Sequence, residues 1–541
     1  MVILILAAVA CFLVLLIIYS IRYTQNSMVS FFIASVLSAV ALTSSYYFVN
    51  GRVNLNNAYL LRLFIPAVGG AVLYGFFYGQ KGNTSGSGPK GDFIDLETVG
   101  GKKIVFRNPF DNFLVYGGQG AGKTKSVGKH LLYHYIRLHW AGFIFDFKDG
   151  DYTKTAFELV KRHNYPHSVY HVNFINPSCS HRVNLIKPSV VKDPNFFIQL
   201  MADILIANMG ESKQDEWFLG ALGIWRGVAV RFYMDYPHIC TIPHIVNFIV
   251  QSNSDANRSQ RLQTFLQARP ESRGLAFAYL AAEGSERTQA SMRATLGNYI
   301  SALSFNKNVQ YILSGDDFDY NLIDPKDPKL LIVANSFQQE AILGPIISLM
   351  VTLSARAFTM QNRIKFFNFL DEATTFKIPN FERMLSLLRE YLVSFVILTQ
   401  SPAKIEKLYG ELDLRAIEAN CGNKFFGRSL DVKGAESSSK QFSRRDEVKV
   451  TRTTGQSTNN TSSSKSISQT KEQRYDPDFF MQLKPGQFVG RAQNSNYKEF
   501  NFMFKQYVPG DEKDPSVVRL VLDSDIDDNY DKIINEVMNL E

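Results

Sequence analysis

The stretch GGQGAGKT, residues 117 to 124, constrains the fold of this 541-residue chain more than any other feature. It fits the pattern G-x-x-x-x-G-K-[ST]. An apolar run, FLVY (113–116), precedes it, and a helical pattern, SVGKHLLYHYIRLHW (126–140), follows it. A glycine loop between a buried strand and a helix presents backbone N–H groups and a positive helix end to phosphates. The sequence therefore predicts an α/β fold with a phosphate-binding site at a strand end.

The residue types in this loop indicate ATP and Mg²⁺ as its ligands. Lys123 is expected to reach the β- and γ-phosphates, and Thr124 to ligate Mg²⁺. The loop's N–H groups are expected to surround the β-phosphate. The predicted nucleotide-binding residues are Gly117, Gly118, Gln119, Gly120, Ala121, Gly122, Lys123, Thr124 and Lys125.

A phosphate-binding loop needs an acidic partner at a neighbouring strand end, and two runs could supply it. FFNFLDEA ends in Asp371 and Glu372, so Asp371 could serve Mg²⁺ while Glu372 polarises the attacking water. FIFDF offers only Asp146, which could equally cap a helix or pair with Lys148. The Asp-Glu pair is therefore the preferred candidate.

Two further polar residues follow the acidic pair. Gln400 ends the next apolar run, SFVILTQ, where it could contact the γ-phosphate or simply end a strand. Arg389 lies at the end of a predicted helix. It could complement the helix dipole or project into a neighbouring subunit's ATP site, and its position leaves both open.

Elsewhere, apolar runs alternate with helical patterns, which predicts buried, parallel strands. Residues 185–315 carry only helical spacing and are predicted to form an all-helical insertion. Residues 437–474 are rich in Ser and Thr and are expected to be mobile or a loosely held hairpin.

Three apolar stretches precede residue 80, at 1–20, 30–49 and 58–79. Each is long enough to span a bilayer, so two to three membrane spans are expected, a cleaved signal peptide being the alternative for the first. A glycine-rich linker follows, residues 81–94. Because the ATP site must face the nucleotide pool, the remainder is expected in the cytoplasm.

The cysteine content and the net charge indicate which kinds of site and partner this protein can have. The four cysteines lack C-x-x-C spacing, which argues against a zinc site or a disulfide framework. Residues 511–541 hold ten Asp or Glu and three Lys or Arg, a balance of −7. Since the whole chain carries +8, the other 510 residues carry +15. This balance suits DNA or an anionic lipid surface.

Taken together, GGQGAGKT, the block from FFNFLDEA to LTQSPAK, EWFLGALGIWRG and ERTQASMRATLGNYISAL resemble the type IV coupling proteins of bacterial conjugation and secretion. The resemblance covers residues 95–505 and is closest to the F-plasmid-like branch. It implies a RecA-like motor domain with an all-α insertion, assembled as a homohexamer at the bacterial inner membrane. The implied partners are single- and double-stranded DNA, relaxosome proteins and the type IV secretion channel.

The resemblance also assigns roles and boundaries. Its catalytic set is Lys123, Asp371, Glu372, Arg389 and Gln400, with Thr124 and Asp371 on Mg²⁺. The implied division is a membrane anchor (1–80), the linker (81–94), a nucleotide-binding domain (95–184 and 316–505), the all-α domain (185–315) and an acidic tail (506–541).

Two departures and two alternatives stand beside this interpretation. DFKDGDY has Asp151 where the family usually has Glu, and Leu392 and Val393 replace a usual glycine after the Arg389 helix. A chromosome-partition DNA pump of the same superfamily would lack the helical insertion. A non-hydrolysing receptor for secretion substrates would not need Lys123 and the Asp-Glu pair.

Overall fold

A computed structural model describes residues 91 to 541, apart from 149, 209–214, 253–255, 336, 458–459 and 541. Asp92–Glu541 forms one compact unit. The three apolar stretches before residue 80 lie outside the described residues, so the membrane spans stay a prediction. Within the described ranges, no helix is long and apolar enough to cross a membrane.

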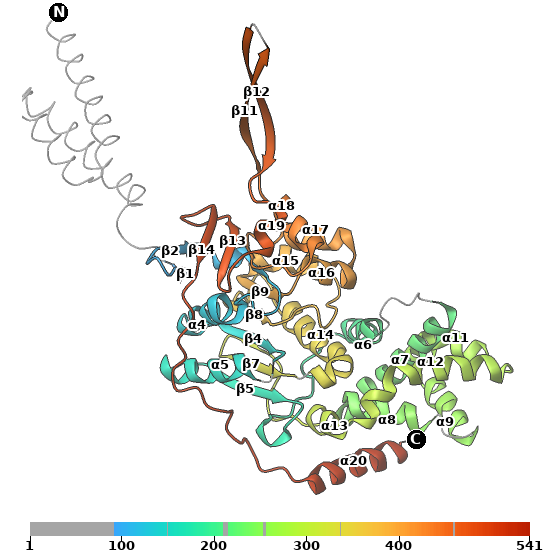
Figure 1. Cartoon of the computed structure of the whole chain (residues 1–541). Helices are drawn as coiled ribbons and strands as arrows, with labels where there is room; N and C mark the ends of the chain where they lie inside the picture. Colours follow the sequence, from blue (N-terminus) through green and yellow to red (C-terminus); the bar gives the residue numbers. More distant parts are fainter. Residues whose placement is uncertain are drawn as a thin grey trace, which may run out of the picture. The chain divides into compact units, whose positions relative to one another are not determined.

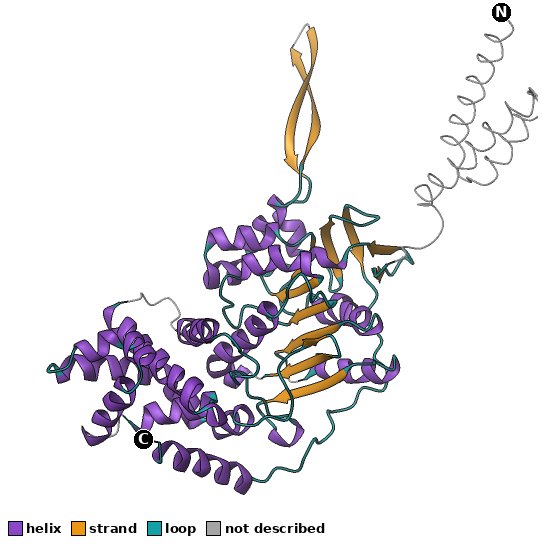
Figure 2. Ribbon diagram, turned by 180° about the vertical axis from the view of Figure 1, so that it is seen from behind, coloured by secondary structure: helices purple, strands orange, loops and turns teal. Residues whose placement is uncertain are grey.

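A 10-stranded sheet forms the centre of this unit (Figures 1 and 2). Its order is β14-β13-β10-β3-β9-β8-β4-β7-β5, and β6 pairs with β7. The strands are β3 (Phe113–Tyr116), β4 (Ala141–Asp146), β5 (Ser168–Asn173), β6 (Ile323–Asp324), β7 (Asp327–Ala334), β8 (Phe366–Leu370), β9 (Val393–Thr399), β10 (Asn423–Phe426), β13 (Gln487–Ala492) and β14 (Glu499–Met503). From β10 to β5 they pair in parallel, which confirms the predicted parallel strands.

Helices cover both faces of the sheet, as Figure 2 shows. Phe113 and Val115 of β3 face one apolar cluster, and Leu114 and Tyr116 face the other. The helices on the first side are α4 (Lys129–Arg137) and α5 (Asp151–Arg162); those on the second include α14 (Glu340–Arg356), α15 (Phe381–Leu387), α16 (Pro402–Tyr409) and α17 (Glu411–Ala419). Because both faces are buried, β3 reads as a continuous apolar run.

Between β5 and β6 the described residues form helices and no α/β unit. We call this part the helical region. It comprises α6 (Pro194–Asn208), α7 (Glu216–Asp235), α8 (Ile242–Gln251), α9 (Ala256–Gln267), α10 (Pro270–Leu275), α11 (Phe277–Ala281), α12 (Glu286–Phe305) and α13 (Lys307–Leu313). Phe218, Trp225 and Phe232 of α7 are buried in its core.

The remaining elements include two further strand pairs and a helix near the end of the described residues. β1 (Ile94–Glu97) pairs with β2 (Lys103–Phe106). The Ser/Thr-rich segment forms a hairpin of β11 (Arg444–Ser457) and β12 (Asn460–Gln473), flanked by α18 (Val432–Lys440) and α19 (Pro477–Met481). The chain ends in α20 (Asp523–Met538), which packs on α8 and α13.

Helix α7 approaches its neighbours closely at its glycines, and at Gly223 the neighbouring atom is backbone. A Cβ on Gly223 of α7 would lie 2.8 Å from the carbonyl oxygen of Leu275 in α10. No side chain fits there, because the neighbouring atom is backbone.

We therefore expect Gly223→Ala to lower the free energy of unfolding by about 1–3 kcal/mol through overpacking. Helix propensity alone favours alanine by about 1 kcal/mol. Gly297→Ala in α12 is the matched control, since nothing lies within 4 Å of its Cβ position. That variant is expected to be neutral or stabilised. Thermal unfolding of both variants measures the difference. A Gly223→Ala variant more stable than Gly297→Ala would contradict the packing argument.

Candidate active site

The glycine loop leaves β3 at the carboxyl end of the sheet and enters a helical turn, η2 (Lys123–Gly128), that continues into α4. Gly120 and Gly122 have φ of 72° and 93°. These left-handed conformations favour glycine, so the spacing of glycines in the motif sets the path of the backbone.

Backbone groups from later parts of the chain hold the loop. The Gly118 N–H donates to the Arg428 carbonyl oxygen (2.8 Å), just beyond β10. The Gly486 N–H donates to the Ala121 carbonyl oxygen (2.9 Å), from the turn before β13. These contacts leave little room: a Cβ on Gly122 would lie 2.6 Å from the Gly486 nitrogen.

Asp371 and Glu372 follow β8, whose neighbours are β9 and β4. They are 1% and 2% exposed. Asp371 Oδ2 and Glu372 Oε2 are buried and have no hydrogen-bond partner among the described residues. Burial raises the pKa of Asp371 to about 7; Lys148 opposes this shift, and the carboxylates of Asp146 and Glu372 add to it.

The carboxylate of Glu372 is the point where three strand ends meet. Lys123 Nζ lies 3.8 Å from Glu372 Oε1, and Lys148 Nζ lies 3.4 Å from the same oxygen. Gln400 Nε2 donates to it at 3.3 Å. Glu372 itself has a positive φ of 45°, a strained conformation for a residue with a side chain. The structure therefore brings Lys123, Asp371, Glu372 and Gln400 together; their catalytic roles stay a prediction.

Lys123 is buried, and its ammonium donates to the Gly117 carbonyl oxygen at 2.6 Å. Burial lowers the pKa of Lys123, and the nearby Glu372 carboxylate opposes that shift. Thr124 follows it in η2 and is half-buried, whereas Gln119 and Lys125 are exposed at the surface. The loop thus turns some of its predicted residues inward and leaves others open to solvent.

Arg389 does not join this cluster. It lies in η6 (Leu388–Tyr391) and pairs with the buried Asp111 at 2.9 Å. Asp111 precedes β3, so this pair lies at the amino end of the strand, whereas the glycine loop lies at its carboxyl end. The expected glycine position after the arginine keeps a glycine-like backbone, because Leu392 has a φ of 65°.

Asp146 has the structural role that the sequence left open. It ends β4 and accepts hydrogen bonds from the Thr153 N–H (2.7 Å), the Thr153 hydroxyl (2.8 Å) and the Lys148 N–H (3.2 Å). It therefore caps the start of α5. The side chain of Lys148 pairs with Glu372 and not with Asp146.

Two basic residues near the loop were not predicted. Lys148 was considered only as a partner for Asp146. Arg428 follows β10, a strand that the sequence analysis did not recognise, and its Nη2 lies 3.4 Å from the Gln119 carbonyl oxygen. Arg428 Nε is buried without a hydrogen-bond partner in the described ranges. A basic residue directly after a short apolar run, FFGR, was the available signal.

Comparison with known proteins shows the family to which the chain belongs. Residues 98–483 match the type IV secretion-system coupling protein DNA-binding domain family. The chain belongs to this family. It is 24% identical over 375 residues to the coupling protein TraD of Escherichia coli K12. That match covers 65% of this chain and 46% of TraD, so the chain spans about half the length of this relative.

Solved structures of another coupling protein share the α/β fold. The bacterial conjugative coupling protein TrwB, lacking 70 residues, matches with a TM-score of 0.58 at 14% identity, over 79% of this chain and 92% of TrwB. TrwB in complex with ADP and Mg²⁺ matches with the same TM-score, over 76% and 89%. The α/β fold predicted from the sequence is therefore shared with TrwB.

Removing the Asp146 carboxylate should weaken the start of α5. We expect Asp146→Ala to lower the free energy of unfolding by about 1–2 kcal/mol, because the Thr153 N–H loses its acceptor. Asp146→Asn keeps one oxygen and should cost less. Thermal or denaturant unfolding of both variants measures the difference.

The titration of Asp146 gives a second test, in which stability is measured as a function of pH. Burial raises the pKa of Asp146 to about 6, above its unfolded value of about 3.9. The protonated form is therefore favoured in the native state, and this contribution to stability is lost as pH rises through about 6. The stability of wild type relative to Asp146→Asn should fall between pH 4 and pH 7. A difference that does not change with pH would contradict this assignment.

Proposed function

We propose that this chain is an inner-membrane coupling ATPase that recruits the relaxosome and drives single-stranded DNA, with its relaxase, into a type IV secretion channel. The observation that carries the proposal is the cluster of buried Lys123, Asp371 and Glu372 with half-buried Gln400 beside the glycine loop. A member of this family with no hydrolytic role would have no need for an acidic pair at that strand end.

ATP is the expected ligand of the loop. Lys123 would leave the Gly117 carbonyl oxygen for the β- and γ-phosphates. Arg428 and Lys148 would add positive charge from either side of β3 and β9. The nucleotide complexes of TrwB support this expectation only by likeness of fold.

The residues present fit Mg²⁺, which takes oxygen ligands. Asp371 Oδ2 is buried and unpartnered in the described part of the chain, and Thr124 offers a hydroxyl at the start of η2. When bound, Mg²⁺ neutralises charge that develops on the phosphates. Glu372 would accept the proton of the attacking water, and Gln400, bonded to Glu372, would orient that carboxylate.

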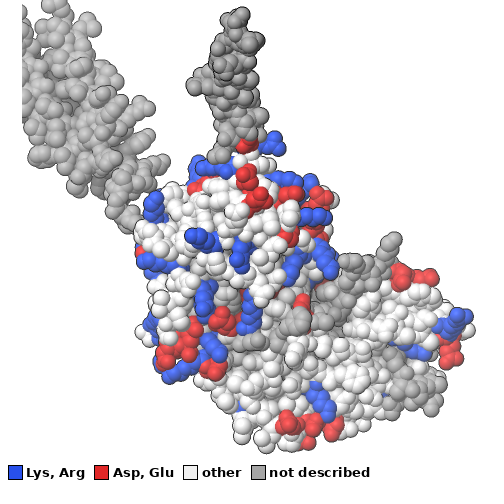
Figure 3. All heavy atoms as spheres, viewed as in Figure 1, with Lys and Arg blue, Asp and Glu red and all other residues white. Residues whose placement is uncertain are grey.

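The proposed partners are DNA, the secretion channel and the membrane. They are inferred from the charge of the chain and from its family. Residues 1–510 carry +15, and basic positions Arg444, Arg445, Lys449 and Arg452 lie along β11. Figure 3 shows Lys and Arg interspersed with Asp and Glu over one face of the described part. Contacts to phosphates would make affinity fall steeply with salt and depend little on sequence. Spans before residue 80 and assembly into hexamers belong to the same proposal.

Glu372→Gln is expected to preserve ATP binding and lower turnover roughly 10²-fold or more, because only the proton acceptor is lost. The amide can keep the contact with Gln400. Lys123→Ala is the companion variant and should lose both binding and turnover. DNA-stimulated ATP hydrolysis and binding of a fluorescent ATP analogue are the two measurements. Turnover by Glu372→Gln at the wild-type rate would show that Glu372 is not the proton acceptor. A wild-type chain that hydrolyses no ATP but still binds secretion substrates would favour the receptor function.

The position of Arg389 at the amino end of β3 favours action on a neighbouring subunit's site. One strand of four residues already separates Asp111 from the loop, roughly 13 Å. Mixing Arg389→Ala subunits with Lys123→Ala subunits should therefore restore part of the activity, since an intact loop can face an intact arginine. An arginine acting in trans contributes on the order of 10³ or more to the rate. Absence of rescue in rings shown to exchange subunits would leave only the ion pair with Asp111.

A further inference from the structure

The chain after β14 crosses from the sheet to the helical region. We call residues 504–522 together with α20 the C-terminal strap. Figure 1 shows it passing α4 and α5 before α20. One contact lies on the helical turn that follows the glycine loop: the Tyr507 N–H donates to the Lys125 carbonyl oxygen at 2.7 Å. The Tyr507 ring is buried and packs edge-on against His130 of α4.

A second contact on the same helix is an ion pair. Glu512 lies 3.3 Å from Lys129, which is only 4% exposed and also pairs with Asp151 at 2.8 Å. The Thr155 hydroxyl donates to Glu512 at 2.6 Å. Since Lys129 is buried, losing Glu512 would leave part of its charge uncompensated. Breaking this ion pair therefore costs more free energy than breaking an exposed one.

The strap then crosses the turn after β5. The Val518 N–H donates to the Ser178 carbonyl oxygen (2.9 Å), and the Val521 N–H donates to the Ser178 hydroxyl (3.1 Å). Arg519 pairs with Asp317 just beyond α13. Backbone and charge contacts therefore fix the strap between its two ends.

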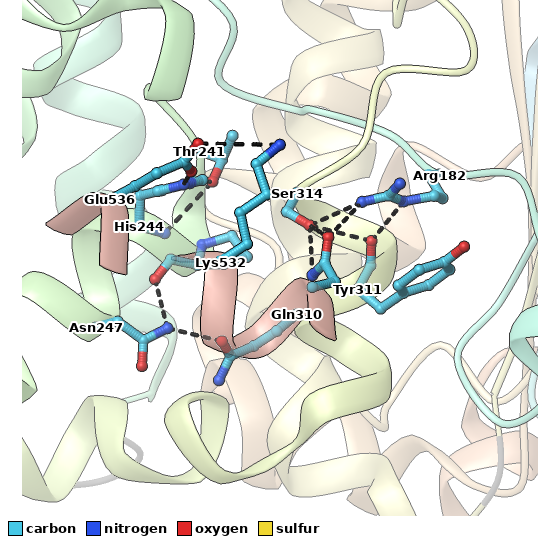
Figure 4. Close-up of polar contacts among 11 residues, drawn as sticks. Arg182, Thr241, His244, Asn247, Gln310, Tyr311, Ser314, Lys532 and Glu536 are labelled. Carbon is cyan, nitrogen blue, oxygen red and sulfur yellow. Dashed lines mark hydrogen bonds and ion pairs between the residues drawn. The ribbon is translucent and has the colours of Figure 1, made fainter. Parts of the chain in front are cut away.

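α20 ends the strap on the helical region (Figure 4). Ile526, Ile533 and Val537 of α20 are buried. Around them, Glu536 lies 2.8 Å from His244 Nε2 in α8, and Arg182 donates to Asn529 at 2.9 Å. An apolar face with a polar rim is the anatomy of a specific interface.

We propose that the C-terminal strap couples the nucleotide site to the helical region, so that ATP at the glycine loop and docking of α20 favour each other. A docked strap holds η2 and α4 from outside and preorganises the loop, whereas release of α20 frees the segment that bears Tyr507 and Glu512. By reciprocity, ATP must then stabilise α20 docking by the same factor. The inference rests on the proposed ATP binding.

Ile533→Asp tests the coupling from the distal end. It places a carboxylate where the side chain is 2% exposed and should release α20. Affinity of the full chain for a fluorescent ATP analogue should fall about fivefold, the lower range of allosteric coupling. Asp531→Asn, on the exposed side of the same helix, is the control and should change nothing. Released α20, seen as faster tryptic cleavage at the exposed Lys513, with unchanged affinity would overturn the proposal.

A gentler variant guards against misfolding. Glu536→Gln with Asn529→Ala removes the ion pair with His244 and the hydrogen bond from Arg182, and keeps the apolar face of α20. It should move affinity and cleavage in the same direction by a smaller factor. Unchanged affinity together with faster cleavage would again count against the coupling.

A double-mutant cycle tests whether the strap carries the effect. Tyr507→Ala combined with Glu512→Ala removes the ring packing and the ion pair on α4, so Ile533→Asp should have no further effect on affinity in that background. Additive losses would refute transmission through the strap. In parallel, the ATP analogue should slow cleavage at Lys513 in wild type and not in Lys123→Ala. If wild type binds no ATP analogue, the proposed function fails; if it binds and the cycle is additive, only the strap fails.

Discussion

The buried carboxylate of Glu372 is the interaction on which the rest of the site depends. A carboxylate that is 2% exposed needs partners, because an isolated buried charge is costly. Three strand ends supply them: Lys123 after β3, Gln400 after β9 and Lys148 after β4. These groups can meet only because the sheet order is β3-β9-β8-β4 with all four strands parallel. The order of the strands in the sheet therefore determines which side chains can meet at Glu372.

Local sequence patterns predicted those elements whose structure is set by the spacing of their own residues. The glycine loop, β8 and α12 follow from spacing within a few residues. β5 (SVYHVN) and β10 (NKFF) were missed because polar residues interrupt their apolar runs. Their parallel pairing with β7 and β3 makes them strands. The partner of Arg389 is Asp111, far earlier in the chain, and no local pattern joins them. Arg428 was missed for the same reason, since its strand reaches the loop only in the folded sheet.

The sequence predicted an acidic tail over residues 506–541, and residues 511–541 carry a charge balance of −7. In the structure, its acidic and apolar residues are already engaged by Lys129, His244 and the core of the helical region. Exposed carboxylates remain along the outer side of α20, among them Asp523, Asp528 and Asp531. Recruitment through this segment would therefore use the outer side of α20, or compete with its intramolecular contacts.

The backbone contacts around the glycine loop also set an order of events during synthesis. Gly118 is held by Arg428, Ala121 by Gly486 and Lys125 by Tyr507, each more than 300 residues later in the chain. The motif therefore leaves the ribosome well before the groups that shape it, which emerge only after more than 300 further residues have been added. Closing such long loops is slow, and the contacts that repay it form late. A chain arrested after β9 would carry every residue of the sequence motif and still lack the loop that the finished protein holds in place.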